Sequence, residues 1–320
     1  MKRHLHVLAA AALLVTALTA CGSAEADAAA ADGPTTIKVG TLKGQPHLFH
    51  PHLYADRATD GLTYEVVLFD TSPDIKNAVV SGAIDFGVTG VPSALSGAAA
   101  GQDVVVVAAA ADGGSGIVGS ADVTSVQDLV GRTVGFPQGS SQEILLRLTL
   151  EQNGIDIDDL KLVNLPFADM ANALASGKID AFSSAELGPS IALQAGAHQI
   201  VSPYETPVGK VNIGLVTTQR LIDEEPELVQ SVVNTHVRAT ENLISDPEGW
   251  AAGVVEQYGL DAAVVATAIA NIWPRWDLDD EYVAQVDALI GQMHALGYLE
   301  SAPAAADVLD RTFVTAATSS

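Results

Sequence analysis

The chain of 320 residues contains a single cysteine, Cys21, and 15 basic residues against 39 acidic ones. One thiol cannot form an intramolecular disulfide, and a zinc site built on several thiolates is excluded. The formal net charge of −24 repels nucleic acid, so nucleic-acid binding is disfavoured. A small anion can still bind locally, because backbone N–H groups and helix N-termini attract it against the overall field.

Aromatic side chains and long apolar runs are also scarce. Only 5% of the residues are aromatic while 48% are hydrophobic, so the core must consist mainly of Ala, Val, Leu and Ile. This apolar content is ample for burial and argues against disorder. The run from Val7 to Leu18 is too short to span a bilayer. The length predicts roughly two domains of ~150 residues each.

The N-terminal segment carries an export signal. Lys2 and Arg3 precede the apolar run, which ends in Leu18-Thr19-Ala20-Cys21, a sequence that resembles a bacterial lipobox. We therefore predict a lipoprotein signal peptide over residues 1–21, with Cys21 as the lipidated residue, and a flexible tether over 22–35. The alternative is an ordinary signal peptide with a chance cysteine. We expect an extracytoplasmic protein that meets the cell membrane only through its lipid anchor.

An internal repeat organises the remainder of the chain. At a constant offset of 95 residues, Val39-Gly40 matches Val134-Gly135, and residues 74–86 match residues 169–181 at Asp, Asn-Ala, Ser-Gly and Ile-Asp. Two long copies indicate two similar lobes rather than a solenoid, which needs three or more short units.

Each copy alternates apolar strands with helices. In the first copy, residues 35–41, 63–69, 83–89 and 103–110 are predicted strands, with a helix over 72–82. In the second, strands at 132–136, 160–165 and 178–183 surround helices at 140–154 and 167–177. This pattern predicts an α/β fold with mostly parallel sheets covered by helices. From Leu221 the chain becomes helical, and we expect these helices to pack back on lobe one.

The sequence resembles the extracytoplasmic substrate-binding proteins of ABC importers. It is most similar to the family of nitrate, taurine and aliphatic-sulfonate receptors, with relatives for thiamine-pyrimidine precursors. The resemblance rests on the lipobox and on residues 81–95, 128–155, 164–182 and 212–233. It implies a two-lobed periplasmic-binding-protein-like fold of type II that closes on its ligand. The predicted boundaries are 36–120 plus 219–320 for lobe one and 121–218 for lobe two.

The same resemblance implies a function without catalysis. The protein would capture a small anionic or polar organic solute, such as a sulfonate, taurine or nitrate, and deliver it to the permease and ATPase of an importer. It implies no cofactor and no catalytic residue. A receptor for a thiamine-pyrimidine precursor or related heterocycle is the alternative. Pyrimidine synthases of the same fold use an active-site histidine, but they share a cysteine-rich motif that this chain lacks.

The candidate site lies where strands run into helices, because ligands of open α/β sheets bind beyond the carboxyl ends of the strands. Gly139, Ser140 and Ser141 precede an apolar helix, so N–H groups, the helix dipole and two hydroxyls converge there. A capping role for Ser140, with Glu143 completing a capping box, is compatible with this reading. Thr89-Gly90 is the matching turn in lobe one, where a plain strand-to-helix turn is the alternative.

Other polar residues complete the predicted ligand-binding set. Sulfonate receptors of this family often carry an aromatic side chain near residues 183–187, where this chain has Ser183, Ser184 and Glu186. Glu186 can accept a hydrogen bond from a ligand N–H or remain in solvent, and Asp112 has the same ambiguity. We also expect Tyr54, Phe136, Phe182 and Trp273 to set the pocket volume. The full predicted set is Lys43, Gln45, His47, His50, Thr89, Gly90, Ser115, Gly139, Ser140, Ser141, Ser183, Glu186 and Asn212.

Three histidines, His47, His50 and His52, fall within six residues of one another. The repeat places His47 opposite Gln142, in the first strand-to-helix loop of lobe one. Pro46 and Pro51 interrupt a regular ladder, so a helix is expected to begin only around Pro51. Three roles remain open: packing at the cleft rim, hydrogen bonding to a ligand, and metal binding as in a metal receptor. Metal binding is the least favoured, because thiolates are lacking and the nearest carboxylate after the cluster is that of Asp56, with none close before it.

Overall fold

The computed structural model describes residues 34–59 and 61–317. The predicted signal peptide, Cys21 and nearly all of the predicted tether lie outside these residues. Thr35, the last residue assigned to the tether, already begins β1. The described residues contain no helix with the length and hydropathy needed to cross a bilayer.

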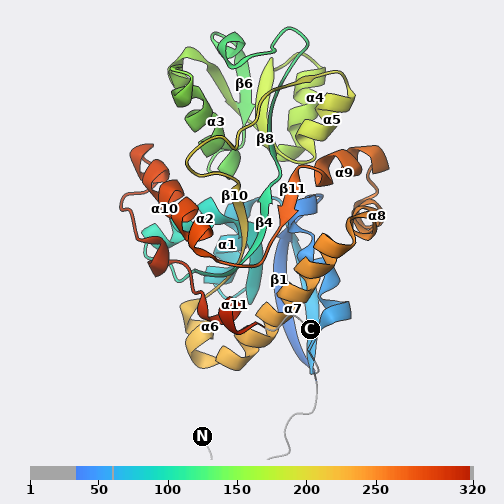
Figure 1. Ribbon diagram of the computed structural model, residues 1–320, viewed down its shortest axis with the longest axis vertical. Helices are drawn as coiled ribbons and strands as arrows, with labels where there is room; N and C mark the ends of the chain where they lie inside the picture. The colour runs from blue at the N-terminus through green and yellow to red at the C-terminus, as the bar shows by residue number, and fades with distance from the viewer. Residues whose placement is uncertain (1–33, 60, 318–320) are drawn as a thin grey trace, which may run out of the picture. The chain divides into compact units, whose positions relative to one another are not determined.

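Two sheets divide the fold into two lobes (Figure 1). We call the elements around the first sheet lobe one and those around the second sheet lobe two. The first sheet has the order β11-β4-β10-β3-β1-β2, and the second has the order β7-β6-β8-β5-β9. The likeness to known structures given below confirms the predicted α/β class and two-lobed fold.

The strands of lobe one are β1 (Thr35–Leu42), β2 (Leu62–Phe69), β3 (Phe86–Gly90), β4 (Val105–Gly113), β10 (Val211–Thr217) and β11 (Ile272–Pro274). Its helices are α1 (Ser72–Val80), α2 (Val91–Ala99), α6 (Gln219–Glu224), α7 (Pro226–Ser245), α8 (Pro247–Tyr258), α9 (Ala262–Ile269), α10 (Asp280–Ala295) and α11 (Thr312–Ala316). Lobe two contains β5 (Ser115–Gly119), β6 (Thr133–Phe136), β7 (Lys161–Asn164), β8 (Ala181–Ala185) and β9 (His198–Val201), with α3 (Ser141–Gln152), α4 (Met170–Ala175) and α5 (Gly188–Gln194). The 95-residue offset carries β3 onto β8 residue for residue.

Both sheets are mixed rather than mostly parallel. Strands β2, β1 and β3 pair in parallel, as do β7, β6 and β8. The other pairs are antiparallel: β10 with β3 and β4, β11 with β4, and β5 with β8 and β9. The crossings between the lobes also differ from the predicted boundaries. Residues 115–119 pair in the second sheet and residues 211–217 in the first, so the lobes exchange near Gly114 and again between Val201 and Val211.

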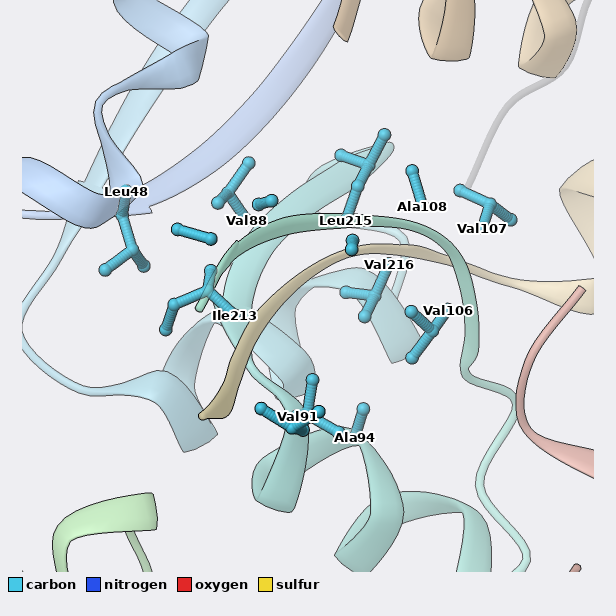
Figure 2. Close-up of a cluster of buried hydrophobic side chains, with 14 of the residues drawn as sticks. Leu48, Val88, Val91, Ala94, Val106, Val107, Ala108, Ile213, Leu215 and Val216 are labelled. Carbon is cyan, nitrogen blue, oxygen red and sulfur yellow. The ribbon is translucent and has the colours of Figure 1, made fainter. Parts of the chain in front are cut away.

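The core of lobe one explains why the chain needs so few aromatic residues. Val106, Val107 and Ala108 of β4 and Leu215 of β10 are fully buried, together with Val91 of α2. Figure 2 shows these small branched side chains around the central strands. Helices cover both faces of the sheet, with α1 and α2 on one face and α7 on the other. Every side chain of the central strands β4 and β10 is therefore buried. The late helices therefore pack on lobe one, as predicted.

Candidate ligand-binding site

Two neighbouring pockets lie between the lobes, at the carboxyl ends of β1, β3, β6 and β8. The inner pocket is lined by Leu42, His47, Ser72, Gly90, Pro92, Ser93, Gly139, Ser140, Ser141, Gln142, Phe167, Ala185, Asn212 and Ile213. Its free volume is about 20 Å³, which is room for one or two water molecules. The location agrees with the rule for open α/β sheets.

The outer pocket adjoins the inner one and is much larger. Its volume is about 580 Å³, within the range of small-molecule sites, and Leu42 and Phe167 line both pockets. Apolar residues predominate in its wall, among them Pro166, Leu187, Ile191 and Leu260. Among the described residues that line it, the charged side chains are those of Lys43, Asp70 and Asp169. Lys43 pairs with Asp70 at 2.9 Å between Nζ and Oδ1, so its charge is compensated at the rim.

Three helices begin at the inner pocket. Ser72 opens α1, Gly90 is the N-cap of α2, and Ser140 is the N-cap of α3. No side chain caps α2, so the first N–H groups of this helix have no side-chain partner. In α3, the Ser140 Oγ accepts from the Glu143 N–H at 3.4 Å, while a Glu143 carboxylate oxygen accepts from the Gly139 N–H at 2.8 Å. Three positive helix ends thus point at one small volume.

The side chains of the inner pocket are neutral. Asn212 donates through Nδ2 to the Gly113 carbonyl, and Ser72 accepts from the Gly90 N–H at 3.2 Å. Burial lowers the pKa of His47 to about 3, so this imidazole is uncharged at neutral pH. Its Nδ1 has no hydrogen-bond partner. The pocket therefore offers hydrogen-bond groups and helix dipoles to an anion but no formal positive charge.

The structure brings together part of the predicted set. His47, Gly90, Gly139, Ser140, Ser141 and Asn212 line the inner pocket, and Lys43 and Gln45 line the outer one. Leu42, Ser72, Ser93 and Phe167 also line the inner pocket but are not in the predicted ligand-binding set. Ser72 and Ser93 carried a usable signal, because each lies in the first turn of a helix that follows a predicted strand.

Other predicted site residues lie outside both pockets because their polar groups are used within the fold. Ser183 donates to the Gln142 carbonyl at 2.8 Å, and the Ser115 Oγ accepts from Gln142 Nε2 at 2.9 Å. Thr89 donates to the Ser72 carbonyl. The Glu186 carboxylate accepts from the Ser190 hydroxyl at 2.8 Å and from Asn271 at 3.1 Å. These residues shape the pocket from behind instead of facing it.

Asp112 and the expected aromatic residues also lie elsewhere. Asp112 pairs with Arg275 at 3.0 Å. Phe136 and Phe182 lie in the core of lobe two, and Trp273 is 40% exposed beneath the Lys210 ammonium group. The sequence did not reveal which face of each strand points to the cleft, so it missed Leu42 and Phe167.

The three clustered histidines have separate environments. His47 lies in the 3₁₀ turn η1 (Pro46–Leu48), while His50 and His52 lie in η2 (His50–Leu53), so the helix expected around Pro51 is replaced by short 3₁₀ turns. His50 is fully buried against His236, with ring centroids 4.9 Å apart. The His52 Nε2 bonds to the Tyr258 hydroxyl at 2.8 Å. In the described part of the chain, no group of three or more His, Cys, Asp or Glu side chains can hold a metal ion.

A family model described as NMT1/THI5 like matches residues 58–249, which include strands of both sheets. The chain belongs to this family. A Brucella abortus binding protein is 31% identical over 121 residues, but the match covers only 38% of this chain and 38% of that relative. An Escherichia coli K12 protein named for binding aliphatic sulfonates is 26% identical over 245 residues, covering 75% of this chain and 76% of its own.

The fold is also that of a solved receptor. The alkanesulfonate-binding protein SsuA from Xanthomonas axonopodis pv. citri, bound to MOPS, superposes with a TM-score of 0.77. The likeness covers 88% of this chain and 100% of that chain at 24% identity. It shows that the two-lobed arrangement is the one found in that binding protein.

Proposed function

We propose that this protein is the solute-binding component of an ABC importer and captures a small organic anion, with a sulfonate as the leading class. One observation carries the proposal: the N-termini of α1, α2 and α3 converge on a neutral inner pocket. Helix N-termini hold anions through free N–H groups and the helix dipole. The names of the relatives support the same reading.

The sizes of the two pockets support the proposal that each holds a different part of the ligand. The inner pocket accommodates only a compact group, such as the oxygens of a sulfonate. The outer pocket is apolar and spacious, so it suits the organic part of the molecule. Inorganic nitrate would fill the inner pocket alone. A pyrimidine precursor is the runner-up: the amide nitrogens of Asn212 and Gln142 are bound within the fold, which leaves their amide oxygens to accept from a heterocycle N–H.

The remaining elements of the proposal concern how the protein is delivered and used. The lipobox at Cys21 supports a lipid anchor that holds the two lobes outside the cytoplasm, where a permease with its ATPase would receive the ligand. The division into two lobes supports capture by closure. We further propose that the protein breaks no bond, which the names of its relatives as binding proteins support.

A thermal-shift panel of alkyl sulfonates, taurine, nitrate, bicarbonate and pyrimidines tests the proposal. A ligand present at 100 times its Kd stabilises the folded state by about 2.7 kcal/mol, which raises the Tm by several degrees. We expect the largest shift with an organic sulfonate. A panel in which no anion raises the Tm would count against the proposal, and a shift confined to pyrimidines would favour the runner-up.

A further inference from the structure

Helix α3 is packed between the two lobes. Leu146 and Leu150 lie in the core of lobe two, whereas Leu145 and Leu148 belong to the hydrophobic cluster of lobe one. All four side chains are buried. Because α3 packs on β8 of the second sheet, the contacts of Leu145 and Leu148 form a seam between the lobes. Movement of lobe two away from lobe one would expose this seam to water.

A polar bridge lies beside the seam. Tyr298 follows α10 in lobe one, and its hydroxyl donates to Glu143 Oε1 of α3. Arg147, one turn further along α3, donates through Nε to the same hydroxyl at 3.1 Å and pairs with Glu143 at 3.0 Å. Each lobe therefore contributes a hydrogen-bond partner to one three-residue cluster.

The bridge is joined directly to the inner pocket. The second carboxylate oxygen of Glu143 accepts from the Gly139 N–H, and the Glu143 N–H donates to Ser140. Gly139 and Ser140 both line the inner pocket. The Glu143 side chain is only 2% exposed, so its carboxylate depends on protein donors rather than on water. Without the Tyr298 hydroxyl, the Glu143 carboxylate would keep Arg147 and the Gly139 N–H as its hydrogen-bond donors.

We propose that Tyr298 is a latch that holds α3 of lobe two against lobe one and thereby sets ligand affinity from outside the pocket. The proposal names a device that regulates the site proposed above, and its effect on affinity rests on that proposed function. The effect on the separation of the lobes does not, because the latch joins two parts of the protein itself. Tyr298 is a positioning residue, since it touches Glu143 and neither pocket.

The test compares Tyr298→Phe with Tyr282→Phe in the full chain. Tyr282 lies on α10 of the same lobe, and its hydroxyl has no hydrogen-bond partner, so its removal controls for the loss of a buried hydroxyl. Small-angle X-ray scattering of the ligand-free protein reports the separation of the lobes. Isothermal titration with an alkyl sulfonate reports Kd.

We expect Tyr298→Phe to increase the radius of gyration of the ligand-free protein, while saturating ligand restores the parent value. The Kd should rise by up to about tenfold. This change corresponds to the free energy that one charge-assisted hydrogen bond contributes to closure of the two lobes. Tyr282→Phe should change neither quantity. Glu143→Gln weakens the same bridge. The double variant, Tyr298→Phe with Glu143→Gln, should therefore change the radius of gyration and Kd little more than the single variant with the larger effect.

An unchanged ligand-free radius in Tyr298→Phe would overturn the latch, even if Kd weakened. Additive effects in the double variant would overturn it as well. If the parent bound no sulfonate, the proposed function would fail, yet the comparison of ligand-free radii would still decide whether Tyr298 holds the lobes together.

Discussion

His47, His50 and His52 are near neighbours along the chain, yet the fold gives each a different partner. Pro46 and Pro51 lack an N–H and begin successive 3₁₀ turns, so the three imidazoles do not share one helix face. Only His47 reaches the inner pocket. His50 packs against His236 inside lobe one, and His52 joins η2 to α8 through Tyr258.

Replacement of His47 should weaken ligand binding without unfolding the protein. His47→Leu keeps a similar apolar volume but removes the ring nitrogens, so we expect a loss of about fivefold to tenfold in affinity, the worth of one hydrogen bond. Isothermal titration measures this change. His52→Gln, which keeps a partner for Tyr258, should retain the parent Kd. Equal affinities in both variants would contradict a role for His47 in binding.

Buried histidines make stability depend on pH. His236 donates through Nε2 to the Ala109 carbonyl and accepts at Nδ1 from the Tyr54 hydroxyl, which fixes a neutral ring. Burial lowers the pKa of His236 to about 4. The folded state therefore binds fewer protons than the unfolded state below pH 6.5. The stabilising contribution is complete above pH 6.5 and declines as the pH falls toward 4.

Urea unfolding at pH 7 and pH 5 measures this dependence. We expect His236 alone to account for a loss of about 2 kcal/mol between the two values. His236→Gln should be less stable at pH 7 but should lose less on acidification. His198→Gln, on an exposed strand, should keep the full loss. A loss that is identical in both variants would show that other groups cause the acid sensitivity.

Among the helices and strands, the N-termini of α1, α2 and α3 provide the polar groups of the inner pocket. Each of α1, α2 and α3 follows a strand after a connection of at most four residues, so the sheets position the first N–H groups of these helices. The N-caps of α2 and α3 both lie in the wall of the inner pocket. A cap in this place has two effects, because it satisfies the helix end and also presents a polar group to a ligand.

A comparison of Ser140 with a capping residue outside the pockets separates the effect on stability from the effect on ligand binding. Ser140→Ala should cost about 1 kcal/mol of stability and also weaken ligand binding. Thr218 caps α6 in the same way, accepting from the Leu221 N–H at 3.1 Å, but it lies outside both pockets. Thr218→Ala should therefore cost a similar free energy of unfolding and leave Kd unchanged. A Ser140→Ala protein with the parent Kd would reduce Ser140 to a capping role.

The sequence predicts the positions of strands and helices better than it predicts which of their side chains face the cleft. Hydrophobic periodicity and capping residues predicted seven of the eleven strands that the structure describes, and the repeat indicated two similar lobes. Strands β5, β9, β10 and β11 were not predicted, and β11 lies in the region expected to be helical, where Ile272 and Trp273 pair with β4. Three residues are too few for a periodic signal, and only the partner strand defines them. The cleft-facing Leu42 and Phe167 were missed for a related reason, since an apolar side chain looks alike in a core or a pocket.

For the whole molecule, the decisive feature is the crossing at Gly113–Gly114. Both glycines have positive φ, at 77° and 69°, and their four backbone polar groups bond to three separate segments. Gly113 bonds to Lys210 and Asn212, while Gly114 bonds to Asn271 and Glu186. A Cβ on Gly114 would lie 3.2 Å from the His47 ring. The crossing is therefore in direct contact with the site.

Gly114→Ala should therefore harm binding more than an equivalent change elsewhere. The left-handed backbone alone costs an alanine about 1–2 kcal/mol. Gly131 has a φ of 76° and open space around it, so Gly131→Ala carries the backbone cost without a steric contact. We expect similar losses of stability in both variants and a weaker Kd only in Gly114→Ala. A parent-like Kd in Gly114→Ala would show that the crossing and the pocket are independent.

The position of β10 has a consequence for how the chain acquires its structure. β10 lies between β3 and β4 in the first sheet, although nearly a hundred residues of lobe two separate it from β4. The first sheet therefore stays incomplete until the whole of lobe two has been synthesised, whereas the second sheet is built from one continuous stretch. Lobe two can fold first although lobe one starts first, and β3 and β4 present unpaired edges until β10 arrives.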